Sequence, residues 1–398
     1  MFKIMFLLSI TTIILNADDN VMLFYKKALE TLQFDKIYSL YKESSEISRD
    51  SVIYDKYLNF SLETSYSKTK TDDIPNPFYT TDFSISDKID IFGKSSYAIN
   101  EIALELKTKK NILNIEKEYV FMMLVDMIAQ YQKSKQKLIL HKSLLKKQLY
   151  IYKKLKKLQL VGSISKIDLL RFKNALTILK TKTINENINV DTMKKQLEVY
   201  APNQNIPYLS SQELSCTEES FLSQNQHIKL NDIRYKKLIV KSKALLYEYM
   251  PSLSLEASYE NIGDPTSYGN SYSLHAHLHI PLNISNYKQS EAQRVDALSI
   301  KSKSTEYKLK RQNEYIKRVN EYTNAKKQYK VLNENLNDYI ESEEITKKAF
   351  LKQYINFTTY FQVLTQSLHI KERIIELKYQ EIAQAIILNS ISTGEIYD

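Results

Sequence analysis

The sequence contains few of the residues that end helices and strands. Its 398 residues include 5 glycines and 7 prolines, where average usage of roughly 7% and 5% would give about 28 and 20. A β-sandwich, a Rossmann enzyme or a TIM barrel needs glycine and proline at many tight turns, so these fold classes are excluded. The chain must therefore consist of a few very long elements.

Cysteine is almost absent too. Cys216 is the single one, so no disulfide can form within the chain. The hydrophobic fraction of 43% is too high for a disordered protein. Lysine and arginine exceed aspartate and glutamate by 10, but the lysines are spread along the helical stretches. No basic domain separates, so nucleic acid is not an expected partner.

The N-terminus predicts export. Met1-Phe2-Lys3 precedes an apolar run over 4–15, and Ala17 is followed by acidic residues. This pattern predicts a signal peptide over 1–17. The run is too short to span a bilayer as a helix, and no cysteine follows it that would carry a lipid anchor.

Two long stretches, 94–161 and 282–393, contain neither glycine nor proline and predict long helices. Apolar residues recur in them at seven-residue spacing, which is typical of coiled-coil seams. The seams are Leu124, Tyr131, Leu138, Leu145 and Tyr152; Tyr315, Tyr322, Tyr329, Leu336 and Phe350; and Phe361, Leu368, Ile375 and Ile382. The many tyrosines and Glu343 in register predict helices packed in a layer with one wet side.

Around 57–92 and 251–284 the apolar period changes to two, as in Leu253-Ser254-Leu255-Glu256-Ala257. Turn residues divide each region, from Asp72 to Pro77 in the first and from Gly263 to Asn270 in the second. The pattern predicts two β-hairpins, each with one apolar and one polar face.

The two hairpins match each other, which indicates an internal duplication. The sequence 61–66 aligns with 254–259 at an offset of 193, and at an offset of 194 Gly162, Asp168 and Leu170 fall opposite Asn356, Gln362 and Leu364. Glycine and asparagine both tolerate the left-handed conformation that ends a helix. We therefore predict a first repeat over 18–200 with a helix-pair tip near 162, a linker over 201–226, and a second repeat over 227–398 with a tip near 356.

Four strands of about 9–11 residues have the length that crosses an outer membrane. No segment after the signal peptide is apolar enough for a transmembrane helix. A membrane sheet must close into a barrel, and the smallest such barrels have about eight strands. The chain must then oligomerise, each copy contributing four strands.

Three short motifs carry a family resemblance: Gly162-Ser163-Ile164-Ser165-Lys166-Ile167-Asp168-Leu169-Leu170, Met250-Pro251-Ser252-Leu253-Ser254-Leu255 and His279-Ile280-Pro281-Leu282. With the duplication and the signal peptide, the chain resembles the TolC-like outer-membrane efflux proteins. The resemblance implies a mainly α fold with a small β part, in which coiled-coil helices form a periplasmic tunnel and a homotrimer builds a 12-stranded barrel in the outer membrane of a Gram-negative bacterium. It implies a passive exit duct that docks to a periplasmic adaptor (membrane fusion protein) and an inner-membrane pump of RND or ABC type.

The resemblance also assigns a gate at the periplasmic tips. Its expected residues are Gly162, Asp168, Gln353, Asn356, Thr358, Gln362 and Thr365. The sequence departs from the family here, because Asn356 replaces the second glycine, Gln362 and Thr365 replace acidic residues, and Gln353 and Thr358 replace a tyrosine and an arginine. Three Asp168 side chains, one per subunit, are expected to form a charge ring.

No enzyme signature and no cofactor motif is present. Strand alternation places His275, His277 and His279 on one face, where they are weak candidates for a zinc or copper site or polar residues that face the lumen. The competing interpretation of the whole chain is a periplasmic coiled-coil adaptor or scaffold that never enters a membrane, although such a protein would not need two apolar-faced hairpins.

Overall fold

The computed structural model describes residues 17–55, 59–71, 74–90, 92–247, 250–264, 267–280 and 284–397. The predicted signal peptide lies outside this range except for Ala17. The chain divides into two compact units, which are described separately. The helical unit comprises Met1–Phe34, Ile115–Asn225 and Leu309–Asp398, and the sheet unit comprises Asp35–Asn114 and Gln226–Lys308. Each unit takes segments from both predicted repeats.

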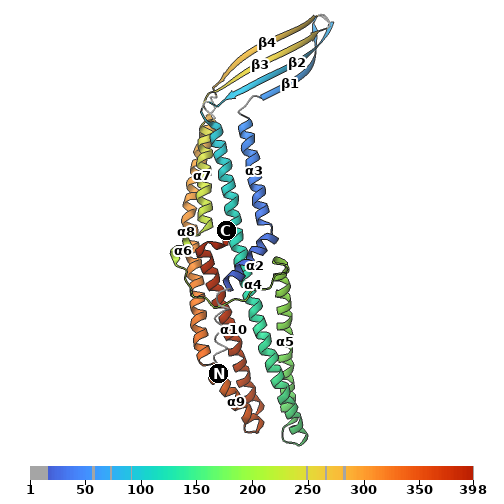
Figure 1. Cartoon of the computed structure of the whole chain (residues 1–398), viewed down its shortest axis with the longest axis vertical. Coiled ribbons are helices and arrows are strands. Elements are labelled where there is room, and N and C mark those ends of the chain that lie inside the picture. Colours follow the sequence, from blue (N-terminus) through green and yellow to red (C-terminus); the bar gives the residue numbers. More distant parts are fainter. Residues whose placement is uncertain are drawn as a thin grey trace. The chain divides into compact units, whose positions relative to one another are not determined.

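The helices of the described residues are α2 (Ala17–Thr31), α3 (Phe34–Tyr54), α4 (Lys94–Leu160), α5 (Lys166–Tyr200), α6 (Glu218–Ser223), α7 (Gln226–Tyr247), α8 (Ile284–Glu334), α9 (Leu336–Leu351), α10 (Phe357–Thr393) and the 3₁₀ helix η2 (Glu395–Tyr397) (Figure 1). The prediction of long helices is confirmed, because α4 runs for 67 residues without interruption. The second breaker-free stretch divides at Asn335, whose side-chain amide donates to the Val331 carbonyl at 2.7 Å. Such a side-chain bond competes with the helical backbone pattern.

The predicted seams form the core of the helical unit. Leu124, Leu138, Tyr322, Phe350, Leu368 and Ile382 are buried, and Tyr131, Leu145, Tyr152, Tyr315, Phe361 and Ile375 pack half-buried against them. Burying one such side chain contributes about 1.5–3 kcal/mol. The coiled-coil interpretation is therefore confirmed.

Glu343 corrects one detail of that interpretation. The carboxylate is buried, with 9% of the residue exposed, and it accepts hydrogen bonds from Lys371 Nζ at 2.6 Å and Ser367 Oγ at 2.7 Å. Its place in the seam therefore does not mark a wet side. The partners on α10 compensate the cost of removing the charge from water.

The sheet unit carries four antiparallel strands in the order β1 (Asn59–Thr71), β2 (Ile74–Ile89), β3 (Ser252–Asp264) and β4 (Ser267–His279). The two predicted hairpins are confirmed. The offset of 193 relates β1 to β3 residue by residue, since Asn59 corresponds to Ser252 and Thr71 to Asp264.

The strands have 13, 16, 13 and 13 residues, so the predicted length of about 9–11 was too short. The predicted turns were too long, because Ile74 to Pro77 belong to β2 and Gly263 to β3. Pro75 and Pro77 are tolerated in a strand because the β2–β3 ladder starts only at Tyr79, so both prolines pair with β1 alone.

A buried ion pair joins α8 to α4 within the helical unit. Arg311 Nη1 lies 2.5 Å from Glu118 Oε1 and 2.9 Å from Glu314 Oε2, and its guanidinium lies 4.0 Å from the Phe221 ring centroid. Glu118 also accepts a hydrogen bond from the Tyr397 hydroxyl. These contacts hold α8, which follows the second hairpin, against α4, which follows the first hairpin.

We predict that Arg311→Met destabilises the protein by about 3–5 kcal/mol, because it leaves the Glu118 carboxylate buried without its counter-ion. The matched control is Lys317→Met on the same helix, where the lysine side chain is 77% exposed and the expected change is below about 1 kcal/mol. Thermal unfolding followed by circular dichroism in detergent measures both. Equal effects would contradict the assignment of Arg311 as the counter-ion.

Candidate functional site: the helical turns and the sheet

The first turn, between α4 and α5, is built on Gly162. This residue has a φ of 75°, and Ser163 N–H and Gly162 N–H donate to the Leu158 and Gln159 carbonyls at 2.9 and 3.1 Å. This pattern is a Schellman motif, in which glycine takes the left-handed position without a Cβ penalty. Ser165 then caps α5 by accepting from Asp168 N–H at 3.0 Å.

The second turn, between α9 and α10, uses the same geometry with a different residue. Gln353 has a φ of 64°, and Tyr354 N–H and Gln353 N–H donate to the Ala349 and Phe350 carbonyls at 2.9 and 3.0 Å. Asn356 is not left-handed, since its φ is −80°. It is instead the N-cap of α10, accepting from Thr359 N–H at 2.9 Å.

The pairing of Gly162 with Asn356 was therefore wrong, and so was the offset of 194. The turns correspond at an offset of 191, which pairs Gly162 with Gln353 and the cap Ser165 with the cap Asn356. The counterpart of Asp168 is then Thr359 and not Gln362. Sequence matching failed because glutamine gives no sign of a left-handed backbone, whereas asparagine suggests one and here serves as a cap.

The expected gate residues occupy different surroundings. Gln353, Asn356 and Thr358 are exposed at the second turn, and Gln362 and Thr365 are exposed further along α10. Asp168 accepts from Ser165 Oγ at 2.8 Å and lies 3.8 Å from Arg171 Nη1. It thus stabilises the first turn of its own helix. A role in a three-fold charge ring stays a prediction.

An aromatic cluster that the sequence did not predict holds the two helix pairs together. The Phe172 ring of α5 stacks 6.4 Å from Phe350 of α9 and 6.5 Å from Tyr360 of α10, while Phe350 and Tyr360 stack at 4.7 Å. Phe357 meets Phe172 at 5.8 Å. The available signal was the aromatic density of 350–361, where Phe350, Phe357, Tyr360 and Phe361 recur at helical spacing.

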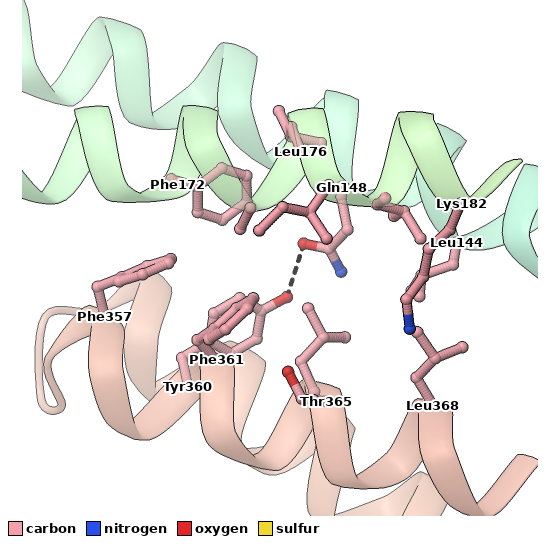
Figure 2. Close-up of a pocket in the computed structure, with 14 residues that line it drawn as sticks. Leu144, Gln148, Phe172, Leu176, Lys182, Phe357, Tyr360, Phe361, Thr365 and Leu368 are labelled. Carbon is pink, nitrogen blue, oxygen red and sulfur yellow. Dashed lines mark hydrogen bonds between the residues drawn. The ribbon is translucent and has the colours of Figure 1, made fainter. Parts of the chain in front are cut away.

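A cavity of about 90 Å³ lies behind this cluster, between the α4–α5 pair and α10. Figure 2 shows the Tyr360 hydroxyl and the Gln148 side chain pointing toward each other, and Thr365, Leu368 and Lys182 also line the cavity. The buried Tyr360 hydroxyl donates to Gln148 Oε1 at 3.0 Å. Burial raises the pKa of Tyr360 to about 12, so the phenol is a neutral donor. Apart from Tyr360, Gln148, Lys182 and Thr365, the lining is apolar. Thr365 is the residue of the expected gate that lines this cavity.

Further along the same helices, His141 of α4 contacts Glu372 of α10, with 2.6 Å between Nε2 and Oε1. Lys137 reaches Glu376 at 2.7 Å, and Lys182 of α5 lies 4.0 Å from Glu372. Burial raises the pKa of Glu372, but the hydrogen bond with His141 and the charge of Lys182 outweigh burial and hold it below its usual value. The three helices therefore meet through charged groups beyond the aromatic cluster.

The sheet has one mainly apolar face, which is exposed and is interrupted by one polar row of Thr64, Thr81, Asn261 and Asn270. Directly paired residues share a face, so two apolar rows cross all four strands: Phe60, Ile85, Ala257 and Leu274, then Leu62, Phe83, Tyr259 and Tyr272. Leu62, Tyr272 and Leu274 are 71%, 81% and 82% exposed. Asp87 shares this face at one end of the sheet, beside Leu255. No helix among the described residues is long and apolar enough to cross a membrane.

The other face is mainly polar, although it also carries Ile262, which pairs with Thr80, and Phe78, which pairs with Ser67. Ser61 pairs with Ser84, Ser84 with Ser258, and Ser258 with Ser273, and the first and last of these pairs share hydroxyl hydrogen bonds at 2.5 Å. The next row places the carboxylates of Glu63, Asp82 and Glu260 on adjacent strands. Like charges placed opposite one another are destabilising.

His275, His277 and His279 lie on this polar face, as predicted. The rings of His275 and His277 are 5.6 Å apart, and His277 Nε2 lies 3.7 Å from Glu256 Oε2 on the neighbouring strand. Within the described part of the chain, no three histidine, cysteine or acidic side chains are arranged to hold a metal ion. The metal site therefore gains no support from this geometry.

No protein-family model matches the chain, and no curated protein sequence matches it. Solved structures do. The Campylobacter jejuni CmeC outer membrane channel is 15% identical, with a TM-score of 0.76 over 95% of this chain and 87% of that one. The outer membrane protein VceC from Vibrio cholerae is 10% identical, with a TM-score of 0.78 over 94% and 96%. The open-state Neisseria gonorrhoeae MtrE outer membrane channel is 10% identical, with a TM-score of 0.68 over 92% and 89%.

The mixture of long coiled-coil helices with a small four-stranded sheet is thus the architecture of outer-membrane channel proteins. The chain has the TolC-like fold, which confirms the fold that the helix-tip and strand motifs indicated.

We predict that Gln353→Gly stabilises the protein, because the left-handed conformation costs a residue with a Cβ about 1–2 kcal/mol and glycine recovers part of it. Gly162→Gln, the reciprocal change, should destabilise by a similar amount. The space around Gly162 is open, with nothing within 4 Å of an added Cβ. The substitution therefore tests only the cost of the left-handed backbone conformation. Thermal denaturation of both variants measures the change in melting temperature. Changes of the same sign in the two variants would contradict the equivalence of the two turns.

We predict that Tyr360→Phe destabilises by about 1–3 kcal/mol, because Gln148 is left buried without its donor. The double change Tyr360→Phe with Gln148→Leu removes both polar groups and should recover most of the loss. A double-mutant cycle on the free energy of unfolding isolates the pair. Strictly additive effects would mean that the hydrogen bond does not form.

Proposed function

We propose that the protein is an outer-membrane channel, the exit duct of a tripartite efflux or secretion system. The observation that carries this proposal is the exposed apolar face of the sheet, two full rows wide on four strands of 13 residues or more. An apolar patch of this kind marks contact with lipid or with a partner. A tilted strand of about 9–11 residues already spans a bilayer.

The polar face supports water on the other side of the same sheet. The serine row and the row of Glu63, Asp82 and Glu260 are polar, and alternation of apolar and polar residues is the pattern of a membrane barrel with an aqueous lumen. In the described range β1 and β4 pair on one side only. Three copies of the sheet would join these edges and close a 12-stranded barrel, which leaves no unpaired backbone in lipid.

The helical unit then forms the periplasmic part of the duct. The turns at Gly162 and Gln353 would lie at the end that faces a periplasmic adaptor, and an inner-membrane pump of RND or ABC type would supply the cargo. The duct itself would conduct passively, as the resemblance to the efflux proteins implies. These partners are what the resemblance to the TolC-like efflux proteins implies, and they are proposals for this chain.

The experiment combines membrane retention with conductance. The purified protein should stay with outer membranes through a carbonate wash and form pores in planar bilayers. Leu274→Arg, on the apolar face, should reduce insertion, because a cation at the bilayer midplane costs about 2–4 kcal/mol. Ser273→Arg, the adjacent residue on the polar face, should insert normally and shift ion preference toward anions.

Release of the protein by carbonate, together with absence of pores, would favour the periplasmic scaffold. Equal loss of insertion in both variants would mean that the faces are assigned wrongly.

A further inference from the structure

The cavity between the α4–α5 pair and α10 lies within the helical unit and has a volume of about 90 Å³. Leucine and phenylalanine side chains from all three helices form most of its lining. A cavity with such walls favours compact apolar molecules over water. Its size excludes drug-sized ligands, which occupy pockets of roughly 300–1,000 Å³. A ligand for this cavity would therefore have one small ring or one short branched chain.

The hydrophobic cluster around the cavity is packed unevenly. Leu176, Leu364 and Leu368 line the cavity, and each is 9% exposed. Ile151 and Leu155 belong to the same cluster but do not line the cavity, and each is 1% exposed. The helices therefore leave apolar surface uncovered where the cavity lies. The hydrophobic effect would favour an apolar ligand that covers this surface.

Gln148 of α4 supplies a hydrogen-bond donor to the cavity. The residue is 4% exposed, and its Oε1 accepts from the Tyr360 hydroxyl at 3.0 Å. This hydrogen bond fixes the amide so that its nitrogen points toward α10, as Figure 2 shows. No residue in the described part of the chain accepts a hydrogen bond from Nε2. Because buried N–H groups need acceptors, a molecule that brings an acceptor into the cavity would be bound here.

Lys182 of α5 supplies a second donor, and this one is charged. It lines the cavity, and its ammonium nitrogen also points toward α10 in Figure 2. Its side chain is 49% exposed and Ile178 of the same lining is 58% exposed, so these two residues mark the opening toward solvent. Lys182 Nζ lies 4.0 Å from Glu372 Oε1, which exceeds hydrogen-bond distance. The ion pair therefore leaves the N–H groups of the lysine available to a ligand.

The other polar groups favour an anion over a cation. Among the described residues that line the cavity, none is an aspartate or a glutamate. Glu372 lies outside the lining, where His141 contacts its Oε1 at 2.6 Å. The Thr365 hydroxyl also lines the cavity and can donate a hydrogen bond. An anionic group in the cavity would thus meet the donors of Gln148, Lys182 and Thr365.

We propose that this cavity binds a small carboxylic acid that carries one apolar ring, of the arylacetate class. The ring lies against the leucine and phenylalanine walls, and the carboxylate accepts from Gln148 Nε2 and Lys182 Nζ. The bound acid contacts α4, α5 and α10 together, so it stabilises the packing of the first helix pair against α10. The inference does not depend on the proposed channel, because every residue of the site belongs to one chain.

The test is a titration of the full-length protein in detergent with 4-fluorophenylacetate, followed by fluorine NMR. A parallel titration uses 4-fluorophenylacetamide, which has nearly the same shape and an acceptor but no charge. Detergent without protein measures the partition of both compounds into micelles. We expect saturable binding of the acid, with a Kd at least about tenfold lower than that of the amide, because a hydrogen bond to a charged group is the stronger one. Absence of saturable binding, or equal binding of acid and amide, would overturn the proposal.

The lysine is tested by Lys182→Met, which should raise the Kd of the acid about tenfold and leave that of the amide unchanged. The matched control is Lys180→Met on the same helix, since Lys180 is exposed and does not line the cavity. It should leave both Kd values unchanged. An equal loss of acid binding in the two variants would mean that the acid is attracted to the basic surface in general, and would overturn the site.

The location is tested by Ala175→Phe, which places a ring in the cavity from its α5 side. This variant should bind neither compound and should melt at a higher temperature than the unmodified protein. Ala175→Leu, a smaller filler, takes its place if circular dichroism shows that the phenylalanine variant has lost helix content. Unchanged binding of the acid in a folded variant of either kind would overturn the assignment to this cavity.

Discussion

The single chain leaves the apolar face of its β-sheet uncovered. A four-stranded sheet with apolar residues on one face has no second layer in the described part of the sheet unit to cover that face, and Leu274 and Tyr272 stay more than four-fifths exposed. Burial of apolar area is the main favourable term in folding. The exposed rows therefore require an environment outside the single chain, and the proposed membrane barrel supplies it.

The helical unit meets the same constraint in a different way. Its core is a narrow seam, so the contacts between helix pairs depend on a few large side chains. Phe172, Phe350 and Tyr360 stack where the α4–α5 pair meets α9–α10. Polar groups are then placed within this seam with their partners: Gln148 accepts from Tyr360, and Glu343 from Lys371 and Ser367. Since a buried polar group without a partner is costly, these pairs favour one register of the long helices over a shifted one.

The two turns show how duplicated segments keep a geometry while their residues change. The Schellman hydrogen bonds and the side-chain cap recur at both turns. Only the first has glycine at the left-handed position. The strain at Gln353 is tolerated because the backbone bonds to Ala349 and Phe350 and the cap at Asn356 hold the turn on both sides. At the second turn, the left-handed conformation of Gln353 is therefore one that glutamine by itself does not favour.

Local features made much of this protein predictable. The lack of glycine and proline, the seven-residue seams and the period-two segments each act over a few neighbouring residues, and α4, the two hairpins and their faces followed from them. Only the tertiary structure decided which residues far apart in the sequence contact each other. Tyr360 and Gln148 are 212 residues apart and His141 and Glu372 are 231 apart, so no local pattern links them. It also decided that Gln353, and not Asn356, takes the left-handed conformation, because the backbone N–H groups of Gln353 and Tyr354 close the turn at the end of α9 while the Asn356 side chain caps α10.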